Sequence, residues 1–182
     1  MIAALYTRDE GSVYDCFDDV ETWGKRLDAR RYAGHEPVIA HPPCNCWGRY
    51  GGHYGNVPGD DGGCGAAAIA AVRRCGGVLE HPAGSGLFLR HLLARPGCGR
   101  DLWGGITYRI DQGMYGHRAK KPTWLYCVGI ELVNPRVSVG PRQWVPVESM
   151  GRPERERTPC ELANLLVGLA RSVSARRERG VA

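Results

Sequence analysis

The sequence predicts an α/β fold, with a mostly parallel sheet and helices on its faces. Short apolar runs of strand length alternate with helical patterns along the chain, which is typical of sheets with parallel strands. The 182 residues, 43% of them hydrophobic, are enough for one domain with a sizeable core. No apolar run approaches membrane-spanning length. We therefore expect a single Rossmann-like domain over residues 1–182, without a membrane partner and located in the cytoplasm.

The first half of the chain contains two predicted strands and one strong helix. Residues 2–6 and 38–40 are apolar and are predicted to be buried strands. The mixed, charged residues 14–32 between them are expected to be partly helical. Residues 51–65 hold seven glycines and are predicted to form a long loop, which in a compact domain is usually functional or disordered. The alanine-rich residues 66–74 predict a helix, which Gly76 and Gly77 end.

The second half begins with strands and one short helix. Residues 78–80 form a predicted strand, and residues 87–94 a helix that Pro96 and Gly97 stop. Residues 106–110 alternate and are rich in β-branched side chains, so a strand is expected there. Residues 124–130 carry no charge, which predicts a strand buried on both faces.

The chain closes with an irregular segment and a helix. Residues 131–156 are rich in proline and charge and are expected to be irregular. The last helix is predicted at about residues 158–172. It begins with Thr158 as N-cap, Pro159 in the first turn and Glu161 completing a capping box.

The strand at residues 38–40 leads into His41-Pro42-Pro43-Cys44, the most informative motif of the chain. The two prolines fix the backbone, so Cys44 is held near the carboxyl end of a buried strand. In open α/β sheets that edge is where ligands bind. A thiol there is a nucleophile, a metal ligand or an ordinary buried residue, and the sequence leaves these three alternatives open.

Two further motifs follow strands or lead into them. Glu80-His81-Pro82 places an acid at the end of an apolar strand, where a role in a site is favoured over a role in capping the next helix. Gln112 follows the strand at residues 106–110 and either faces the same site or is an ordinary polar residue at the end of a strand. Residues 115–123 contain a basic cluster before the last strand, which either contacts phosphate or is solvated: Arg118, Lys120 and Lys121.

These three motifs, taken in order, resemble those of the cytosine carbon-5 DNA methyltransferases. That family has a Pro-Pro-Cys loop with the nucleophile, then Glu-Asn-Val after the next strand, then Tyr-Gly, an Arg-rich stretch and an apolar strand. The resemblance covers roughly residues 36–130, and the chain looks like a minimal relative of a kind that a phage genome could encode.

The resemblance implies a chemical role for each motif. Cys44 matches the nucleophile that adds to carbon 6 of cytosine. Glu80 matches the carboxyl group that hydrogen bonds or donates a proton at ring nitrogen 3. Arg118 lies in the stretch that supports the base carbonyl in the family, where the base is flipped out of the duplex. The expected substrate-binding residues are Pro43, Asn45, His81, Gln112, Lys120 and Lys121.

The resemblance also implies a cofactor and partners. The family uses S-adenosylmethionine, bound by a Phe-x-Gly-x-Gly loop after the first strand, whereas residues 7–12 of this chain contain one glycine. The expected substrate is DNA or a pyrimidine nucleotide, and the net charge of +5 fits a polyanion. The compact chain also suggests a homo-oligomer or a partner subunit.

Two other functions remain open. The chain could be a catalytically silent nucleic-acid-binding module that kept the scaffold, or a small zinc protein. Thiol and imidazole groups that could bind zinc lie close together in sequence: His41, Cys44, Cys46, His53 and Cys64. The Cys-x-Cys spacing and the lack of a following Cys-x-x-Cys pair disfavour zinc, so we predict no metal site. The eight cysteines are expected to be reduced.

Overall fold

The computed structural model of the chain describes residues 1–48, 55–130, 132, 134–138 and 143–179. Six strands form one sheet in the order β2-β1-β3-β4-β6-β5. The strands are β1 (Ile2–Leu5), β2 (Val20–Trp23), β3 (Val38–Ala40), β4 (Gly77–Pro82), β5 (Ile106–Asp111) and β6 (Pro122–Val128). The α-helices are α1 (Cys64–Cys75), α2 (Gly86–Arg90), α3 (Arg152–Glu156) and α4 (Cys160–Arg179), and the 3₁₀ turns are η1 (Ala29–Arg31), η3 (Gln112–Tyr115) and η4 (Val147–Ser149).

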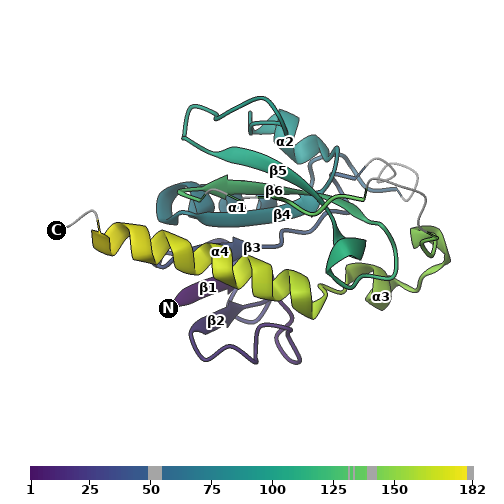
Figure 1. The fold of residues 1–182 in the computed structure, drawn as a ribbon, viewed down its shortest axis with the longest axis horizontal. Helices are drawn as coiled ribbons and strands as arrows, with labels where there is room; N and C mark the ends of the chain where they lie inside the picture. Colours follow the sequence, from purple (N-terminus) through teal and green to yellow (C-terminus); the bar gives the residue numbers. More distant parts are fainter. Residues whose placement is uncertain (49–54, 131, 133, 139–142, 180–182) are drawn as a thin grey trace.

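Helices cover both faces of this sheet, which confirms the predicted α/β class. Helix α1 packs on one face against β3 and β4, and the long helix α4 crosses the other face over β1, β3 and β4 (Figure 1). Successive strand residues point to opposite faces, so each strand contributes to two cores. Val38 and Leu79 pack on the α1 side, and Ile39 and Val78 on the α4 side.

The sheet is mixed, which corrects the expectation of a mostly parallel one. Strands β2, β1, β3 and β4 are mutually parallel, but β6 runs antiparallel to both β4 and β5. The connection from β5 to β6 spans only residues 112–121 and contains no crossover helix. Parallel pairing needs a longer crossover, whereas an antiparallel neighbour can follow a short turn. β6 is nevertheless the inner strand of this half of the sheet, as its apolar sequence predicted.

Residues 14–32 contain a strand, so the prediction of a partly helical segment was wrong. Strand β2 pairs with β1 at the sheet edge, and only the short turn η1 is helical in character. Glu21 is exposed and the other residues of β2 are half-buried. A half-exposed edge strand of four residues gives a weak hydrophobic pattern, and its pairing partner lies outside the local sequence.

Helix α2 and three elements near the end of the chain also differ from prediction. Helix α2 is shorter than the predicted 87–94, because the backbone turns left-handed at Leu92, with φ of 53°. Ser85 caps its N-terminus by accepting a hydrogen bond from the Leu87 N–H. Helix α4 continues beyond the predicted end at residue 172, and α3 and η4 lie in the segment that was expected to be irregular.

Gly77 allows β3 and β4 to approach each other at the start of β4. Its φ is +126°, and a Cβ atom there would lie 2.0 Å from the Val38 carbonyl oxygen. Any other residue would therefore push β4 away from β3. This contact sets the register in which Ile39 pairs with Val78 and Ala40 with Leu79, and thereby places His41 beside Glu80.

Candidate active site at the carboxyl edge of the sheet

The three predicted motifs meet at one edge of the sheet. Strands β3 and β4 are parallel, so the residues after Ala40 lie beside the last residues of β4. Strand β6 is antiparallel to β4, and its first residues are therefore at the same edge, with Thr123 opposite Pro82. The chain order of the motifs gave no indication that the third would arrive from the amino end of an antiparallel strand.

Glu80 is the centre of a hydrogen-bonded network on the α4 side of this edge. Its Oε2 lies 3.0 Å from Nδ1 of His41, and its Oε1 accepts a hydrogen bond of 2.9 Å from Nε2 of Gln112. The same Gln112 amide donates to Oγ1 of Thr123 at 3.0 Å. The side chains of His41 and Glu80 are each 14% exposed, so the pair is nearly buried but reaches the surface.

Tyr14 extends the network to the other ring nitrogen of His41. Its hydroxyl lies 2.7 Å from Nε2 of His41, and the two rings pack with their centroids 5.7 Å apart. Tyr14 is only 2% exposed. Desolvation, together with the charge of Glu80, raises the pKa of Tyr14 well above its ordinary value. Tyr14 is therefore a neutral phenol that positions the imidazole, and it is too buried to meet a substrate.

Glu80 is ionised in this arrangement. Burial alone would raise the pKa of Glu80, but the hydrogen bond and charge of His41, followed by the charge of Lys121, lower it to about 2. At neutral pH Glu80 is therefore a carboxylate whose two oxygens each accept one hydrogen bond. Of the two roles that the resemblance implies, hydrogen bonding and proton donation, this ionised form favours hydrogen bonding. A carboxylate has about four lone-pair sites, so both oxygens keep the capacity to accept another.

Cys44 lies in an exposed position just beyond β3. Its carbonyl accepts hydrogen bonds from the N–H groups of Trp47 and Gly48, at 3.1 and 2.9 Å, which close a tight turn after the thiol. Desolvation, then the charge of Glu80, raise the pKa of Cys44, whereas the charge of Lys121 lowers it. Cys44 lies three residues after His41, whose Nδ1 is 3.0 Å from Glu80, so the thiol is at the same edge of the sheet as the carboxylate. The raised pKa keeps the thiol protonated at neutral pH.

Other predicted residues lie apart from this network. His81 points to the α1 side of β4, opposite to Glu80, and is 1% exposed. Desolvation lowers the pKa of His81 to about 4. Neither of its ring nitrogens makes a hydrogen bond within the described residues, although the Pro43 carbonyl is near enough to affect its pKa. Its predicted place in the substrate site with Glu80 is corrected, because adjacent strand residues face opposite ways.

The basic cluster divides among three partners. Arg118 is exposed and pairs with Glu154 at 2.6 Å, away from the Glu80 network. Lys120 lies 3.7 Å from Asp111. Lys121 donates a hydrogen bond of 2.8 Å from Nζ to the Arg155 carbonyl, and its charge acts on the pKa of both Cys44 and Glu80. Of the three, Lys121 is the one whose charge acts on the groups of the edge site.

Pro43 and Asn45 flank Cys44 and are exposed. The Asn45 amide donates to Oδ1 of Asn56 at 3.4 Å, across the loop that follows Cys44. Trp47 fixes the same loop to the start of α1, because its Nε1 donates to Oδ2 of Asp61 at 2.7 Å. Both predicted residues therefore lie beside the thiol, but neither contacts Glu80 in the described contacts.

Sequence reasoning missed His41, Tyr14 and Thr123 as members of the site. His41 had a usable signal, since it directly follows a predicted strand at the edge that Glu80 also occupies. Tyr14 had none, because it begins the segment that was expected to be partly helical and reaches His41 only through the fold. Thr123 was part of the third motif, but its contact with Gln112 depends on the antiparallel pairing of β5 and β6.

The candidate zinc ligands of the alternative hypothesis do not gather around one point among the described residues. Cys46 is buried and its Sγ donates to the Asp60 carbonyl at 2.9 Å, while His41 lies between Tyr14 and Glu80. His53 lies outside the described residues. Among residues that are described, no three His, Cys, Asp or Glu side chains form a metal-binding group.

The carboxyl end of β1 does not fit S-adenosylmethionine in the way that the resemblance implies. The loop after β1 packs directly onto Gly24, where a Cβ atom would lie 2.2 Å from Oδ1 of Asp9 and 2.9 Å from the Thr7 carbonyl. Asp9 also accepts a hydrogen bond from the Arg26 N–H at 3.0 Å. The loop after β1 is thus held close to Gly24 through Asp9, and it lacks the glycines with which the family's loop approaches its cofactor.

Comparison of the chain with known protein families, with curated proteins and with solved structures finds no match. Within the part of the chain that is described, no helix is long and apolar enough to cross a membrane.

Proposed function

We propose that the protein is a cytosine-modifying enzyme that acts through a covalent adduct of Cys44, as a relative of the cytosine carbon-5 DNA methyltransferases. The observation that carries this proposal is that an exposed thiol follows, three residues later, the histidine that contacts a fixed carboxylate at one edge of an α/β sheet. A thiol can attack carbon 6 of a pyrimidine only if a neighbouring group manages charge on the ring, and Glu80 is such a group.

A Rossmann-like interpretation of the parallel part of the sheet supports the same location. The strand order β2-β1-β3-β4 changes direction between β1 and β3. In doubly wound α/β folds, ligands bind outside the carboxyl ends of the strands at such a switch point. His41 and Cys44 follow β3 at this point of the sheet.

The proposed addition is balanced within the chain. The Cys44 sulfur forms a bond to carbon 6, the carbon 5–carbon 6 π electrons move through carbon 4, and ring nitrogen 3 gains the electron pair. The thiol proton passes by way of the Glu80 carboxylate to nitrogen 3. Because the pKa of Glu80 is low, it holds this proton only transiently. Glu80 can also accept a hydrogen bond from the exocyclic amino group, which distinguishes cytosine from thymine.

The adduct makes carbon 5 nucleophilic, and no step of the proposal passes through S-adenosylmethionine because the loop after β1 packs on Gly24. Solvent can supply a proton to carbon 5 of the adduct. Loss of the original carbon 5 hydrogen and return of the thiol then regenerate cytosine. Exchange of this hydrogen with solvent therefore reports the adduct without any group donor.

A catalytically silent nucleic-acid-binding module is the second candidate. It is favoured by the raised pKa of Cys44, which leaves the thiol protonated, and by the hydrogen bonds that already engage both oxygens of Glu80. In that case the Glu80 network would hold the edge of the sheet together and the thiol would have no chemical role.

Hydrogen exchange at carbon 5 distinguishes the two candidates. The protein is incubated in D₂O with a cytosine-containing oligonucleotide or with deoxycytidine monophosphate, and loss of the carbon 5 proton is followed by NMR. The enzyme hypothesis predicts exchange in the wild type and in Cys98→Ser, and no exchange in Cys44→Ser. Binding of the oligonucleotide without exchange would favour the silent module.

A further inference from the structure

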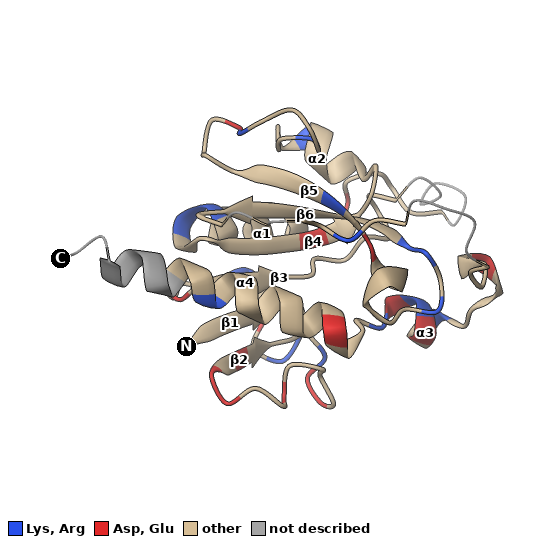
Figure 2. Cartoon of the chain, in the orientation of Figure 1, with Lys and Arg blue, Asp and Glu red and all other residues tan. Residues whose placement is uncertain are grey.

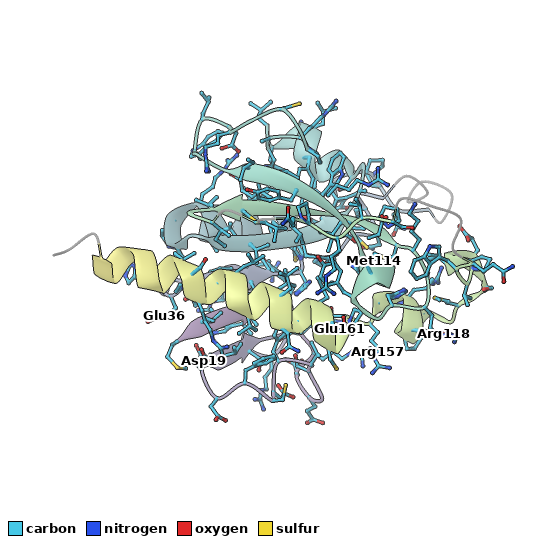
Figure 3. The ribbon with its side chains drawn as sticks, in the orientation of Figure 1. Asp19, Glu36, Met114, Arg118, Arg157 and Glu161 are labelled. Atoms are coloured by element: carbon cyan, nitrogen blue, oxygen red, sulfur yellow. The ribbon has the colours of Figure 1, made fainter. Side chains whose placement is uncertain are left out.

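Four large apolar side chains are exposed where helix α2 leads into the loop before β5. They are called the α2 patch here: Leu89, Leu92, Leu102 and Trp103. Helix α2 and this loop lie along the β5 edge, on the far side of the sheet from α4 (Figure 1). Side chains project outward from both (Figure 3). Single exposed leucines are common on folded proteins, whereas a group of exposed apolar side chains indicates a contact surface.

Contacts of Arg73 join the two parts of the α2 patch. Its guanidinium carbon lies 3.4 Å from the centre of the Trp103 ring, and its Nη2 donates to the His91 carbonyl at 3.2 Å. Trp103 therefore lies beside the end of α2, which carries the leucines. A groove of about 340 Å³ opens there. Its lining combines apolar and basic side chains, among them Leu89, Leu92, Leu93, Arg95 and Arg100.

Leu92 occupies a position at which helices ordinarily have glycine. The Leu93 N–H donates to the Phe88 carbonyl at 2.9 Å, and the Leu92 N–H donates to the Leu89 carbonyl at 3.4 Å. This is the Schellman arrangement that ends a helix, and it needs a left-handed residue, here Leu92 with φ of 53°. The Cβ atom of a leucine disfavours that conformation. Because the Leu92 side chain is 67% exposed, its burial must come from outside the chain.

Leu102 is held at the tip of a fixed turn, although it is 92% exposed. Oδ1 of Asp101 accepts hydrogen bonds from the N–H groups of Trp103 and Gly105, both at 2.9 Å. Oδ2 of Asp101 accepts one from the Tyr126 hydroxyl at 2.8 Å, which ties the turn to the inner strand β6. The turn is therefore ordered before any partner binds, which lowers the entropy cost of association.

The surface around the α2 patch is basic. Residues 86–105 contain one acid and three exposed arginines, Arg90, Arg95 and Arg100. The acid, Asp101, has a side chain that is 6% exposed and already pairs with Arg73 at 3.6 Å. Acidic side chains gather instead around β2, at the opposite edge of the sheet (Figure 2). Apolar anchors within a positive rim are complementary to an apolar face that carboxylates border.

We propose that the α2 patch binds an acidic amphipathic helix of a partner protein, whose apolar side chains enter the groove while its carboxylates meet the arginine rim. Helices bind apolar grooves in this way, through side chains spaced three or four residues apart. The inference goes beyond the proposed function and does not depend on any chemistry at Cys44.

Other occupants fit the α2 patch less well. Two copies of the chain that met patch to patch would bring their arginines together. The acidic surface near β2 could reach the patch of another copy only head to tail, which produces rings or filaments. A lipid surface does not fill a groove with a protruding side chain, and a nucleic-acid strand offers no apolar side chains to the leucines.

Fluorescence anisotropy of a fluorescein-labelled peptide tests the proposal. The peptide has about 16 residues, enough for four helical turns, with leucines along one face and glutamates elsewhere. A second peptide has the same composition in an order that breaks the apolar face, and a third has lysine in place of each glutamate. The first peptide should bind the wild type, and the other two should bind about tenfold more weakly.

Variants of the chain locate the binding. Leu102→Ser should weaken binding about tenfold, whereas Leu27→Ser, at an exposed leucine after β2, should leave it unchanged. Leu92→Gly should also weaken binding, without lowering the melting temperature, because glycine is the usual residue at this position. Arg95→Gln should weaken binding about threefold at low salt and little at high salt, with the exposed Arg26→Gln as control.

The outcomes separate the possible occupants. No binding of the acidic peptide, equal binding of all three peptides, or equal affinities of Leu102→Ser and Leu27→Ser would overturn the proposal. Analytical ultracentrifugation of the wild type alone tests the second copy, and assembly that Leu102→Ser abolishes would replace the partner by another chain. Phosphatidylserine vesicles or single-stranded DNA that compete better than unlabelled peptide would also overturn it. Cys44→Ser should bind the peptide as the wild type does, so a failure of the thiol chemistry leaves this result intact.

Discussion

Two histidines at the carboxyl edge of the sheet, His41 and His81, have opposite environments. His41, on the α4 face, lies between the Tyr14 hydroxyl and the Glu80 carboxylate, with a hydrogen-bond contact at each ring nitrogen. His81, on the α1 face, is fully buried and has no hydrogen-bond partner within the described residues. The two side chains come from neighbouring strands of the same sheet.

The difference shows on which face of the sheet a buried charge is compensated. A buried charge persists only where partners compensate its desolvation, and Glu80 has His41, Gln112 and the charge of Lys121 for this purpose. His81 has no such set and stays neutral. We interpret the α4 face as the chemical side of the edge and His81 as a packing residue beneath the loop that carries Cys44.

Of the changes that test this comparison, removal of the Glu80 side chain should cause the largest loss of stability. Glu80→Ala leaves His41 and Gln112 without their acceptor in a nearly buried place, so we expect a loss of about 3–5 kcal/mol in the free energy of unfolding at neutral pH. Urea denaturation measures this loss, with the exposed Glu10→Ala as control.

The same variant carries a pH signature. The folded pKa of Glu80, about 2, lies below its ordinary value of 4.5. The stability that its ionisation contributes is therefore present above pH 4.5 and is lost as the pH falls toward 2. The gap between wild type and Glu80→Ala should narrow over that range. A difference in the free energy of unfolding that is small at neutral pH, or that does not change with pH, would show that the Glu80 network contributes little to stability.

His81 should show a smaller effect, confined to a different pH range. Its folded pKa of about 4 is below the ordinary 6.5, so the unfolded chain binds a proton there that the folded protein does not. Stability should fall by about 3 kcal/mol as the pH drops from 6.5 to 4. His81→Leu should remove this part of the pH dependence and cost little at neutral pH, because no hydrogen bond is lost. Urea denaturation across the range checks both points, and an unchanged pH slope would refute the packing role.

The smallest expected effect is on the reactivity of Cys44. The charge of Glu80 raises the pKa of the thiol and that of Lys121 lowers it. Glu80→Gln should therefore speed alkylation of Cys44 by iodoacetamide about threefold, and Lys121→Gln should slow it by a similar factor. Peptide mass spectrometry follows the rate, with the exposed Cys98 as internal standard. Rates that do not move in opposite directions would place the thiol away from both charges.

Local sequence was sufficient for most elements of the fold. The strand at residues 38–40 and the helix at residues 66–74 could be predicted from local sequence. Their hydrophobic pattern and the flanking glycine or proline act within a few residues. The edge strand β2 was missed and helix α2 was predicted too long, because in both cases the deciding interaction is not a local sequence pattern. Pairing with β1 makes β2, and a left-handed turn at Leu92 ends α2.

For the candidate site, the sequence by itself determined the residue types and the edge: a proline-braced thiol, an acid at a strand end and a basic cluster before the last strand. The tertiary structure decided which of them meet. It joined Glu80 to His41, Tyr14 and Gln112, turned His81 to the opposite face, and paired Arg118 with Glu154 instead. The physical reason is that strand direction and register, which no local pattern specifies, decide which side chains share a face of the sheet.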